Sequence, residues 1–280
     1  MGMYGDKQHP LVRVCSLAEL TEQDLVLCFV VVLHGRQGCV CTGCTSCDFR
    51  DSTLMFFCPG EGRETIERMK SVEARCLCFC GDWLGRSLDS NESWQAKYRF
   101  FHYTLKESLH LSLREKTVID ACLDDIRKEL EWGVDNFSSE LLALRIHVLL
   151  NECLRFYERQ FITRSCVCKC LMGKIERMVD EYVASGEYDI CRTLSSAAPF
   201  ASRLEMSEAF FADFLKFETG KTVPQYLSFR HFEVAKRILR SSADTLTCVS
   251  RRLGYSSVSC FSLAFKRVVG CTPSEYKHVN

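Results

Sequence analysis

Cysteine is the residue type in this sequence with the clearest capacity for chemistry, because a thiolate can bind a metal or be oxidised. The chain has 19 cysteines. Cys39, Cys41, Cys44 and Cys47 have C-x-C-x-x-C-x-x-C spacing, enough ligands for a tetrahedral zinc site or an iron–sulfur centre. Two further clusters, at residues 76–80 and 166–170, also alternate. In a strand, the alternation of Cys76, Cys78 and Cys80 would place their thiols on one apolar face. We predict no bound cofactor and keep the first cluster as a candidate metal or redox site.

Charge is distributed unevenly along the chain. The 280 residues are formally neutral, with 36 Lys and Arg against 36 Asp and Glu. Residues 195–280 nevertheless hold 12 Lys and Arg against 7 Asp and Glu, a net charge of +5, which leaves −5 on residues 1–194. A basic C-terminal module on an acidic body is typical of a protein in which one domain contacts nucleic-acid phosphates. No run approaches the length of a membrane span, and the N-terminus lacks a hydrophobic signal core, which predicts a cytoplasmic protein with mostly free thiols.

Residues 195–280 have the periodicity of two helix-turn-helix units joined by one longer helix. In the first unit, Ser207 is placed to cap a second helix, and Gly220 can end that helix in the left-handed region. Apolar residues from Tyr226 to Leu239 at three-to-four spacing predict the longer helix. The pattern then repeats and closes at Gly270. Such a pair of units can insert two helices into successive major grooves of DNA.

This segment resembles the C-terminal DNA-binding domain of AraC/XylS-type transcriptional regulators. The matching positions are Phe200-Ala201, Leu204, Met206-Ser207, Glu218 to Lys221, Tyr226-Leu227, Ala235, Leu239, Leu253 to Ser256, Phe261, Phe265-Lys266 and Gly270 to Tyr276. So many positions in register are far more specific than a lone helix-turn-helix pattern. The resemblance implies a sequence-specific regulator that binds double-stranded DNA as a homodimer, with a small-molecule effector and RNA polymerase as further partners.

The resemblance also assigns positions that face DNA. Base-facing positions are Glu208, Ala209, Ala212 and Asp213 in the first unit and Val258, Ser259 and Leu263 in the second. Ser207 and Ser257, which precede them, are also counted among the DNA-binding residues. The family often has Arg or Gln at several of these places, notably Arg where Leu263 stands, so we predict degenerate base readout. Affinity would then depend on DNA shape and on phosphate contacts. The basic residues predicted for such contacts are Lys216, Lys221, Arg251, Arg252, Lys266 and Arg267. Arg203 is a further DNA-binding residue, because it can offset the negative charge of Asp213. His231 stands in the linking helix where the family usually has Arg.

Residues 11 to 80 have the pattern of short strands separated by turns. Leu25–Leu33 is a β-branched run, and Leu54–Cys58 is an apolar run that ends at Pro59-Gly60. Such strands predict a small barrel or jelly roll. The segment from Asp51 to Gly60 is similar to the cupin-like sensor domain of many AraC-type regulators. A metal-dependent cupin enzyme would need several histidines converging on one metal, and this region offers only His34, so we predict that the protein is not an enzyme.

Two helices are predicted after the strands, one over Ser112–Glu131 with a Ser112/Glu115 capping box and one over Ser138–Phe161. AraC-type regulators commonly carry dimerisation helices at this place, although helices that cover the open side of a barrel would explain the pattern equally well. The aromatic residues between 83 and 103 either line a ligand pocket or fill the seam between barrel and helices.

The predicted fold is therefore α+β. It has a cupin-like β-barrel with flanking helices at residues 1–110 as an effector or sensor domain, and a helical pair at 111–165 for dimerisation or barrel cover. An all-α DNA-binding domain of two helix-turn-helix units joined by a long helix follows at 171–280. The alternative function is a cysteine-based metal or redox sensor in which the first cluster regulates DNA binding.

Overall fold

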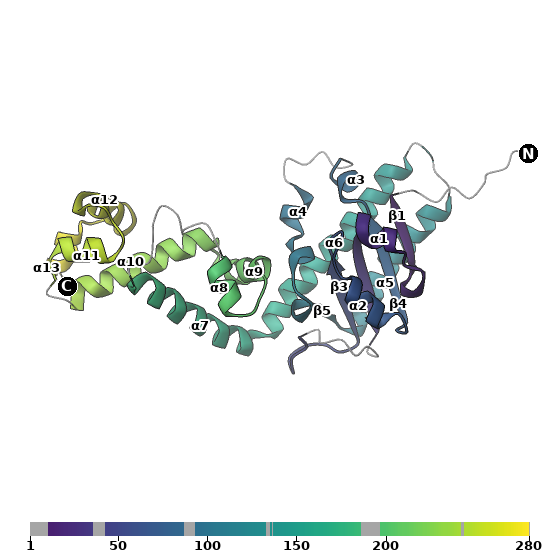
Figure 1. Cartoon of the computed structure of the whole chain (residues 1–280), viewed down its shortest axis with the longest axis horizontal. Coiled ribbons are helices and arrows are strands. Elements are labelled where there is room, and N and C mark those ends of the chain that lie inside the picture. The colour runs from purple at the N-terminus through teal and green to yellow at the C-terminus, as the bar shows by residue number, and fades with distance from the viewer. Residues whose placement is uncertain are drawn as a thin grey trace, which may run out of the picture. The chain divides into compact units, whose positions relative to one another are not determined.

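The computed structural model describes residues 11–35, 43–86, 93–132, 135, 137–185, 197–241 and 244–279. Contacts divide the chain into two units, Met1–Arg164 and Ser165–Asn280 (Figure 1). In the described part of the chain, no helix is both long and apolar enough to cross a membrane.

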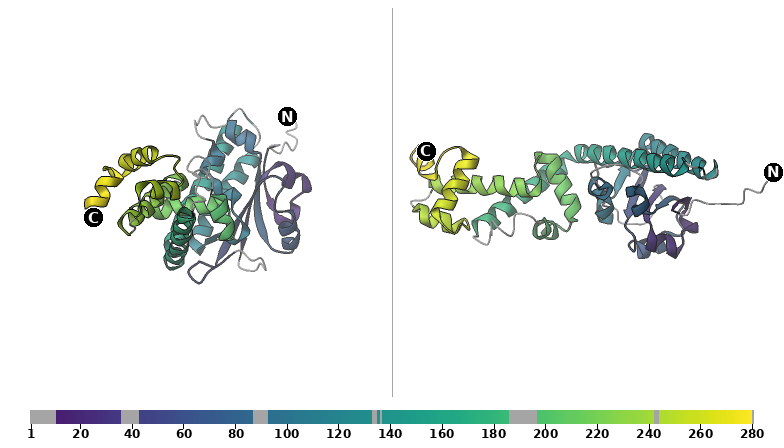
Figure 2. Two further views of the ribbon diagram at one scale, coloured as in Figure 1. Left: turned by 60° about the vertical axis from the view of Figure 1, so that its left-hand side comes forward. Right: turned by 90° about the horizontal axis from the view of Figure 1, so that it is seen from above.

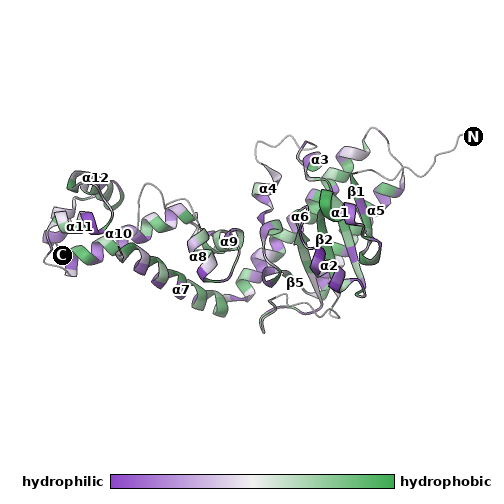
Figure 3. Cartoon of the chain, in the orientation of Figure 1, coloured by the Kyte–Doolittle hydropathy of each residue, from purple (hydrophilic) through white to green (hydrophobic). Residues whose placement is uncertain are grey.

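One antiparallel sheet of five strands forms the centre of the N-terminal unit, with the strand order β1-β4-β2-β3-β5. The strands are β1 (Val12–Ser16), β2 (Phe29–Gly35), β3 (Ser52–Phe57), β4 (Ala74–Phe79) and β5 (Leu109–Leu111). Val31 of β2 pairs with Phe56 of β3 on one side and with Leu77 of β4 on the other. The three inner strands are buried almost throughout, and they are largely green in the hydropathy colouring (Figure 3). Burial on both faces explains why β2 is an unbroken apolar run and not an alternating one.

Helices cover both faces of this sheet (Figure 2). One face packs against the long helices α5 (Leu113–Trp132) and α6 (Ser138–Thr163) and against aromatic residues of α4 (Trp94–Lys97) and the turn that follows it. The other face packs against α1 (Glu22–Leu27) and α2 (Arg63–Met69). A short helix, α3 (Gly81–Arg86), follows β4, and 3-10 turns lie at Leu17–Glu19, Arg99–His102 and Leu105–Glu107.

The predicted cupin-like barrel is corrected to an open sheet. In the described residues, β1 and β5 are the two edges and do not pair with each other. A barrel closes when its first and last strands pair, whereas here the two edge strands stay apart and helices pack on each face of the sheet. The predicted strand Leu25–Leu33 is also corrected, because its first residues belong to helix α1 and β2 begins only at Phe29. Thr21 caps α1 by accepting from the Asp24 amide at 3.1 Å.

The two predicted helices after the strands are confirmed. The Ser112 backbone amide and hydroxyl both donate to the Glu115 carboxylate, at 2.9 and 3.0 Å, which is the predicted capping box at the start of α5. Trp94, Phe100 and Phe101 are buried against the sheet. These aromatic residues fill the seam between the sheet and its helices, one of the two alternatives that the sequence left open.

Helices alone make up the described residues of the C-terminal unit. They are α7 (Ser165–Ala184), α8 (Ala198–Arg203), α9 (Glu208–Thr219), α10 (Val223–Ser241), α11 (Leu246–Arg252), α12 (Val258–Val269) and α13 (Pro273–Val279). The long helix α10 runs from the α8–α9 pair to the α11–α13 group, as predicted (Figure 1). Asp180 of α7 accepts from Arg230 at 2.7 Å and from Arg237 at 2.8 Å, which holds α7 against α10.

Candidate nucleic-acid interface

The second helix of each helix-turn-helix pair begins and ends with the same devices. Ser207 accepts from the Phe210 amide at 3.1 Å at the start of α9, and Ser257 accepts from the Cys260 amide at 3.1 Å at the start of α12. Gly220 and Gly270 end these helices with φ values of 69° and 92°, in the left-handed region that favours glycine. The side chains of the two serines are thus placed as helix caps.

Aromatic residues decide which face of each of these helices is turned outward. In α9, Phe211 and Phe214 are buried, and in α12, Phe261 and Phe265 are buried. The two buried residues in each helix lie three or four positions apart and therefore on one face. The opposite face is left at the surface of the domain.

The outward face of α12 carries the residues that the sequence predicted for the second unit. Leu263 is 73% exposed, Ser259 is exposed and Val258 is half-buried. Ser259 and Leu263 are four positions apart, so they share a face of the helix. Lys266 and Arg267 follow in the last turn and are exposed. Leu263 therefore presents an apolar side chain to solvent on this face of α12.

The outward face of α9 departs from the prediction at one position. Glu208 is exposed, and Ala212 and Asp213 are half-buried. Ala209, however, is 8% exposed, so its methyl group packs inside the first unit and is not available to a base. Its small, apolar side chain fits both a base-facing position and a helix core, and the sequence pattern does not distinguish these two environments.

The basic residues of the C-terminal unit fall into two groups. One group pairs within the protein and includes Arg230, Arg237 and Lys236, the last with Glu233 at 2.8 Å. The other group is exposed and forms no ion pair with any described residue; its members are Arg203, Lys216, Arg251, Arg252, Lys266 and Arg267. Lys221 is half-buried, with its ammonium 5.3 Å from the centre of the Phe229 ring. The second group lies on the helix-turn-helix pairs themselves, where positive charge is free to meet phosphate.

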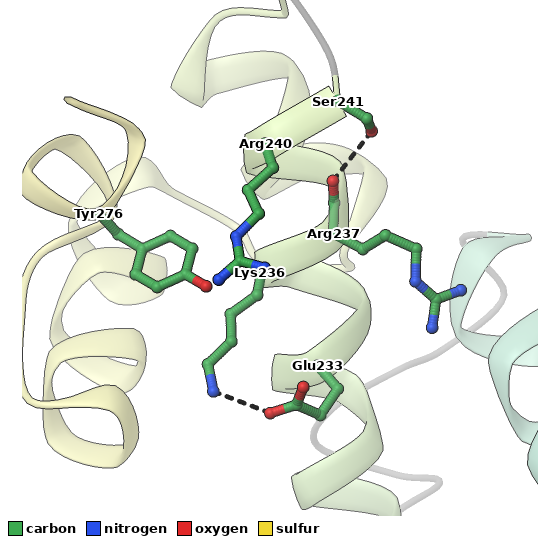
Figure 4. Close-up of a pocket in the computed structure, with 6 residues that line it drawn as sticks. All are labelled: Glu233, Lys236, Arg237, Arg240, Ser241 and Tyr276. Atoms are coloured by element: carbon green, nitrogen blue, oxygen red, sulfur yellow. Dashed lines mark hydrogen bonds and ion pairs between the residues drawn. The ribbon is translucent and has the colours of Figure 1, made fainter. Parts of the chain in front are cut away.

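A cleft of about 470 Å³ lies beside α10. Its basic lining residues are Lys236, Arg237 and Arg240. Arg240 stacks over the Tyr276 ring at 5.2 Å and so joins α10 to α13. Lys236 reaches toward Glu233 on the same helix (Figure 4). The charges around the cleft are engaged in contacts that fix the helices, which separates them from the exposed group.

His231 is buried where the linking helix α10 packs against the second helix-turn-helix pair. It is 2% exposed, and its ring lies 5.5 Å from that of Phe232 and 5.6 Å from that of Tyr255. Burial lowers the pKa of His231 to about 4, so the ring is neutral at pH 7. The position contributes aromatic packing, and it carries no charge toward DNA.

The cysteine cluster is only partly described. Cys44 is exposed and Cys47 is half-buried, both in the turn before β3, whereas Cys39 and Cys41 lie outside the described residues. Of the other two clusters, Cys76 and Cys78 are buried in β4, as the apolar-stripe interpretation predicted. Residues 166–170 are helical, in α7, and only Cys168 among their three cysteines is buried.

Comparison with known proteins gives matches that concentrate in the C-terminal unit. A family model described as a helix-turn-helix domain matches residues 200–278. An uncharacterized HTH-type transcriptional regulator of Bacillus subtilis, YobQ, is 34% identical over 70 residues, which cover 25% of this chain and 29% of that protein. The HTH-type transcriptional activator RhaR of Mannheimia succiniciproducens is 29% identical over 182 residues, which cover 63% of this chain and 60% of that protein. The matched segments thus span less than two thirds of these relatives.

Two solved structures are also similar to the chain. A DNA-binding transcriptional dual regulator from Escherichia coli K-12 is 24% identical, with 39% of this chain and 95% of that chain covered and a TM-score of 0.31. ToxT from Vibrio cholerae O395 is 12% identical, with 96% of each chain covered and a TM-score of 0.33.

Proposed function

We infer that this chain, whose C-terminal segment is a helix-turn-helix domain of the AraC type, regulates transcription by binding double-stranded DNA. The observation that carries the proposal is the repeated construction of α9 and α12. Each begins at a capping serine, ends at a left-handed glycine and turns one face outward, and exposed, unpaired basic residues lie beside both. Two such helices on one linking helix fit successive major grooves.

In the proposed complex, α12 reads bases mainly through apolar contact. Leu263 and Val258 can touch a thymine methyl group, and Ser259 can form one hydrogen bond. None of these side chains can make the bidentate contact to guanine or adenine that is worth about 1–3 kcal/mol. In α9 the burial of Ala209 leaves Glu208, Ala212 and Asp213 for the first groove. We therefore expect a short, A·T-tolerant recognition sequence in which the backbone contacts carry much of the affinity.

The phosphate contacts can be tested by the salt dependence of binding. If the six exposed basic residues each neutralise one phosphate, log K should fall with log [salt] with a slope of about −5, since each contact contributes about −0.9. Lys266→Ala and Arg267→Ala should each make the slope shallower by about one contact and weaken all DNA sequences alike. Arg127→Ala on α5, an exposed arginine of the N-terminal unit, is the control and should not change DNA binding.

The recognition sequence itself can be found by selection from a random DNA library with the reduced, full-length protein at fixed salt. Two enriched elements about one helical turn apart would support the two-groove arrangement. If no sequence is enriched, and the slope is the same for the wild type, Lys266→Ala and the Arg127→Ala control, the outward faces of α9 and α12 do not bind DNA.

We further propose that the chain acts as a homodimer through α6. Phe137, Leu141, Leu144 and Val148 are all exposed and follow the spacing i, i+4, i+7, i+11, which places them along one side of the helix. The opposite side of α6 is buried against the sheet. An apolar stripe on a helix whose other side is already packed fits a second copy of the same helix. Helix α6 would then cover the sheet with one side and form the dimer with the other. An effector would act by favouring one arrangement of the chain.

A further inference from the structure

The turn that carries Cys44 is held in place by its surroundings. Gly43 has a φ of 66°, and a Cβ atom there would lie 1.8 Å from the Lys106 carbonyl oxygen, so the two backbone segments are in direct contact. Asp48 closes the turn by accepting from the Thr45 amide at 2.6 Å and hydroxyl at 2.8 Å. Arg164 then donates to both Asp48 oxygens, at 2.7 and 2.8 Å.

Three groups that commonly bind metals converge at this turn. The Cys44 thiol, an Asp48 carboxylate oxygen and a His110 ring nitrogen all lie within 4.8 Å of one another. They come from two parts of the chain, because Cys44 and Asp48 belong to the turn and His110 to the edge strand β5. Asp48 and His110 are buried, whereas Cys44 is exposed and gives access from solvent. Two of the three donors are thus held in the interior, and the third can be reached by solvent.

A second histidine marks the same face of the sheet. His34 pairs with Thr53, and Thr53 pairs with His110, so the three side chains form one row across β2, β3 and β5. The His34 Nδ1 lies 2.8 Å from the Gly35 carbonyl oxygen and therefore carries the proton. Its Nε2 is then an unprotonated lone pair, buried and without a hydrogen-bond partner among the described residues. A backbone carbonyl that fixes the tautomer in this way is typical of histidines that bind metals.

We propose that Cys44, Asp48 and His110 bind a zinc ion. Thiolate, imidazole and carboxylate are the donors that zinc takes. Tetrahedral bonds of about 2.0–2.3 Å place donor atoms roughly 3.3–3.8 Å apart, so these three donors, within 4.8 Å of one another, would close around the ion. A water molecule completes the four ligands, because His34 lies on the same face of the sheet but outside this group of donors. The set differs from the four-thiolate site that the sequence suggested, since two of its donors are not cysteine and one lies in β5.

Arg164 supports this assignment because it orients a ligand. Its guanidinium holds both oxygens of Asp48, and Asp48 Oδ1 accepts no other described hydrogen bond, so a lone pair remains for the ion. A hydrogen-bonded carboxylate ligand is the usual arrangement in zinc sites. The charges of the ion, the Cys44 thiolate, the Asp48 carboxylate and the Arg164 guanidinium sum to +1, so the two anionic ligands offset the charge of the ion itself.

Zinc binding by the reduced, full-length protein tests the proposal without any DNA. The protein is stripped with a chelator and reloaded, the zinc content is measured by elemental analysis, and the affinity is measured by competition with a chromogenic chelator. We expect one zinc per chain. Cys44→Ser and His110→Gln should each weaken binding by more than about 100-fold, since loss of an outer-shell partner alone costs 10–100-fold.

Cys47→Ser is the matched control, because Cys47 lies in the same turn but outside the cluster. It should leave the zinc affinity unchanged. Cys44 is exposed, so Cys44→Ser keeps the test valid even if the buried His110→Gln variant fails to fold. Two results would overturn the proposal: no stoichiometric zinc in the wild type, or a loss in Cys47→Ser as large as in Cys44→Ser while His110→Gln still binds, which would indicate a four-thiolate site.

Discussion

The buried histidine of the linking helix should make the C-terminal unit sensitive to mild acid. Burial lowers the pKa of His231 from its ordinary value of 6.5 to about 4. Between these two values the unfolded chain binds a proton that the folded chain does not, so stability rises with pH through this window. The stabilisation is complete above pH 6.5 and is lost progressively as the pH falls from 6.5 toward 4.

The size of the effect follows from the two pKa values. One pKa unit corresponds to about 1.4 kcal/mol, so the full loss, reached near pH 4, is about 3 kcal/mol. At pH 5 the loss relative to pH 7 is about 2 kcal/mol. Because His231 is 2% exposed and lies beside the Phe232 and Tyr255 rings, solvent screens a charge on this ring only weakly.

His231→Leu removes the titrating group and keeps an apolar side chain in the same space. Urea unfolding at pH 7 and pH 5, followed by circular dichroism, should show the wild type losing about 2 kcal/mol more than the variant. The three tryptophans, Trp83, Trp94 and Trp132, all lie in the N-terminal unit, so their fluorescence provides an internal control that the substitution should not move. If both proteins lose the same stability between pH 7 and pH 5, the ring is either accessible to water or already paired with an acid, and the reasoning fails.

Three further predictions concern the N-terminal unit. Gly43→Ala should destabilise it by about 1–3 kcal/mol, because of the positive φ and the adjacent carbonyl, whereas Gly35→Ala, which meets open space, should be nearly neutral in urea unfolding followed by fluorescence. Arg164→Ala leaves Asp48 buried and unpaired and should cost about 3–5 kcal/mol in the same assay; a cost below 1 kcal/mol would mean that water replaces the guanidinium. Leu144→Glu should shift the sedimenting species from dimer toward monomer, and an unchanged mass would remove α6 from the interface.

Local signals in the sequence were sufficient for the C-terminal unit. Capping serines such as Ser207 and glycines such as Gly270 act within one turn of a helix, so their types and spacing already define where α9 and α12 begin and end. The same is true of the capping box at Ser112. Ala209 is the exception in the candidate site, because a methyl group has no chemistry that distinguishes a base-facing position from a core position.

The pairing order of the strands, and therefore the open form of the sheet, could not be predicted from the sequence. Strand lengths and turns were recognisable, but closure of a barrel depends on which strands become edges, and that is a property of pairing between distant segments. The run from Phe29 to Leu33 did contain a usable signal, since an unbroken apolar strand indicates burial on both faces. The approach of His110 to Cys44 is likewise long-range, and nothing near either residue in the sequence indicates it.

The surroundings of the individual cysteines explain how a chain with many cysteines can have a single metal site. Burial raises the pKa of Cys28 and Cys58 to about 11 and that of Cys76 further, so these side chains remain thiols at neutral pH and act as small apolar groups of the core. A thiol becomes a ligand when solvent can reach it and when other donors already lie beside it. Among the described cysteines, Cys44 combines exposure with a carboxylate and an imidazole within bonding reach of one ion. The proposed site therefore depends on Asp48 and His110 as much as on a cysteine, and the sequence gives no sign that these two residues lie beside Cys44.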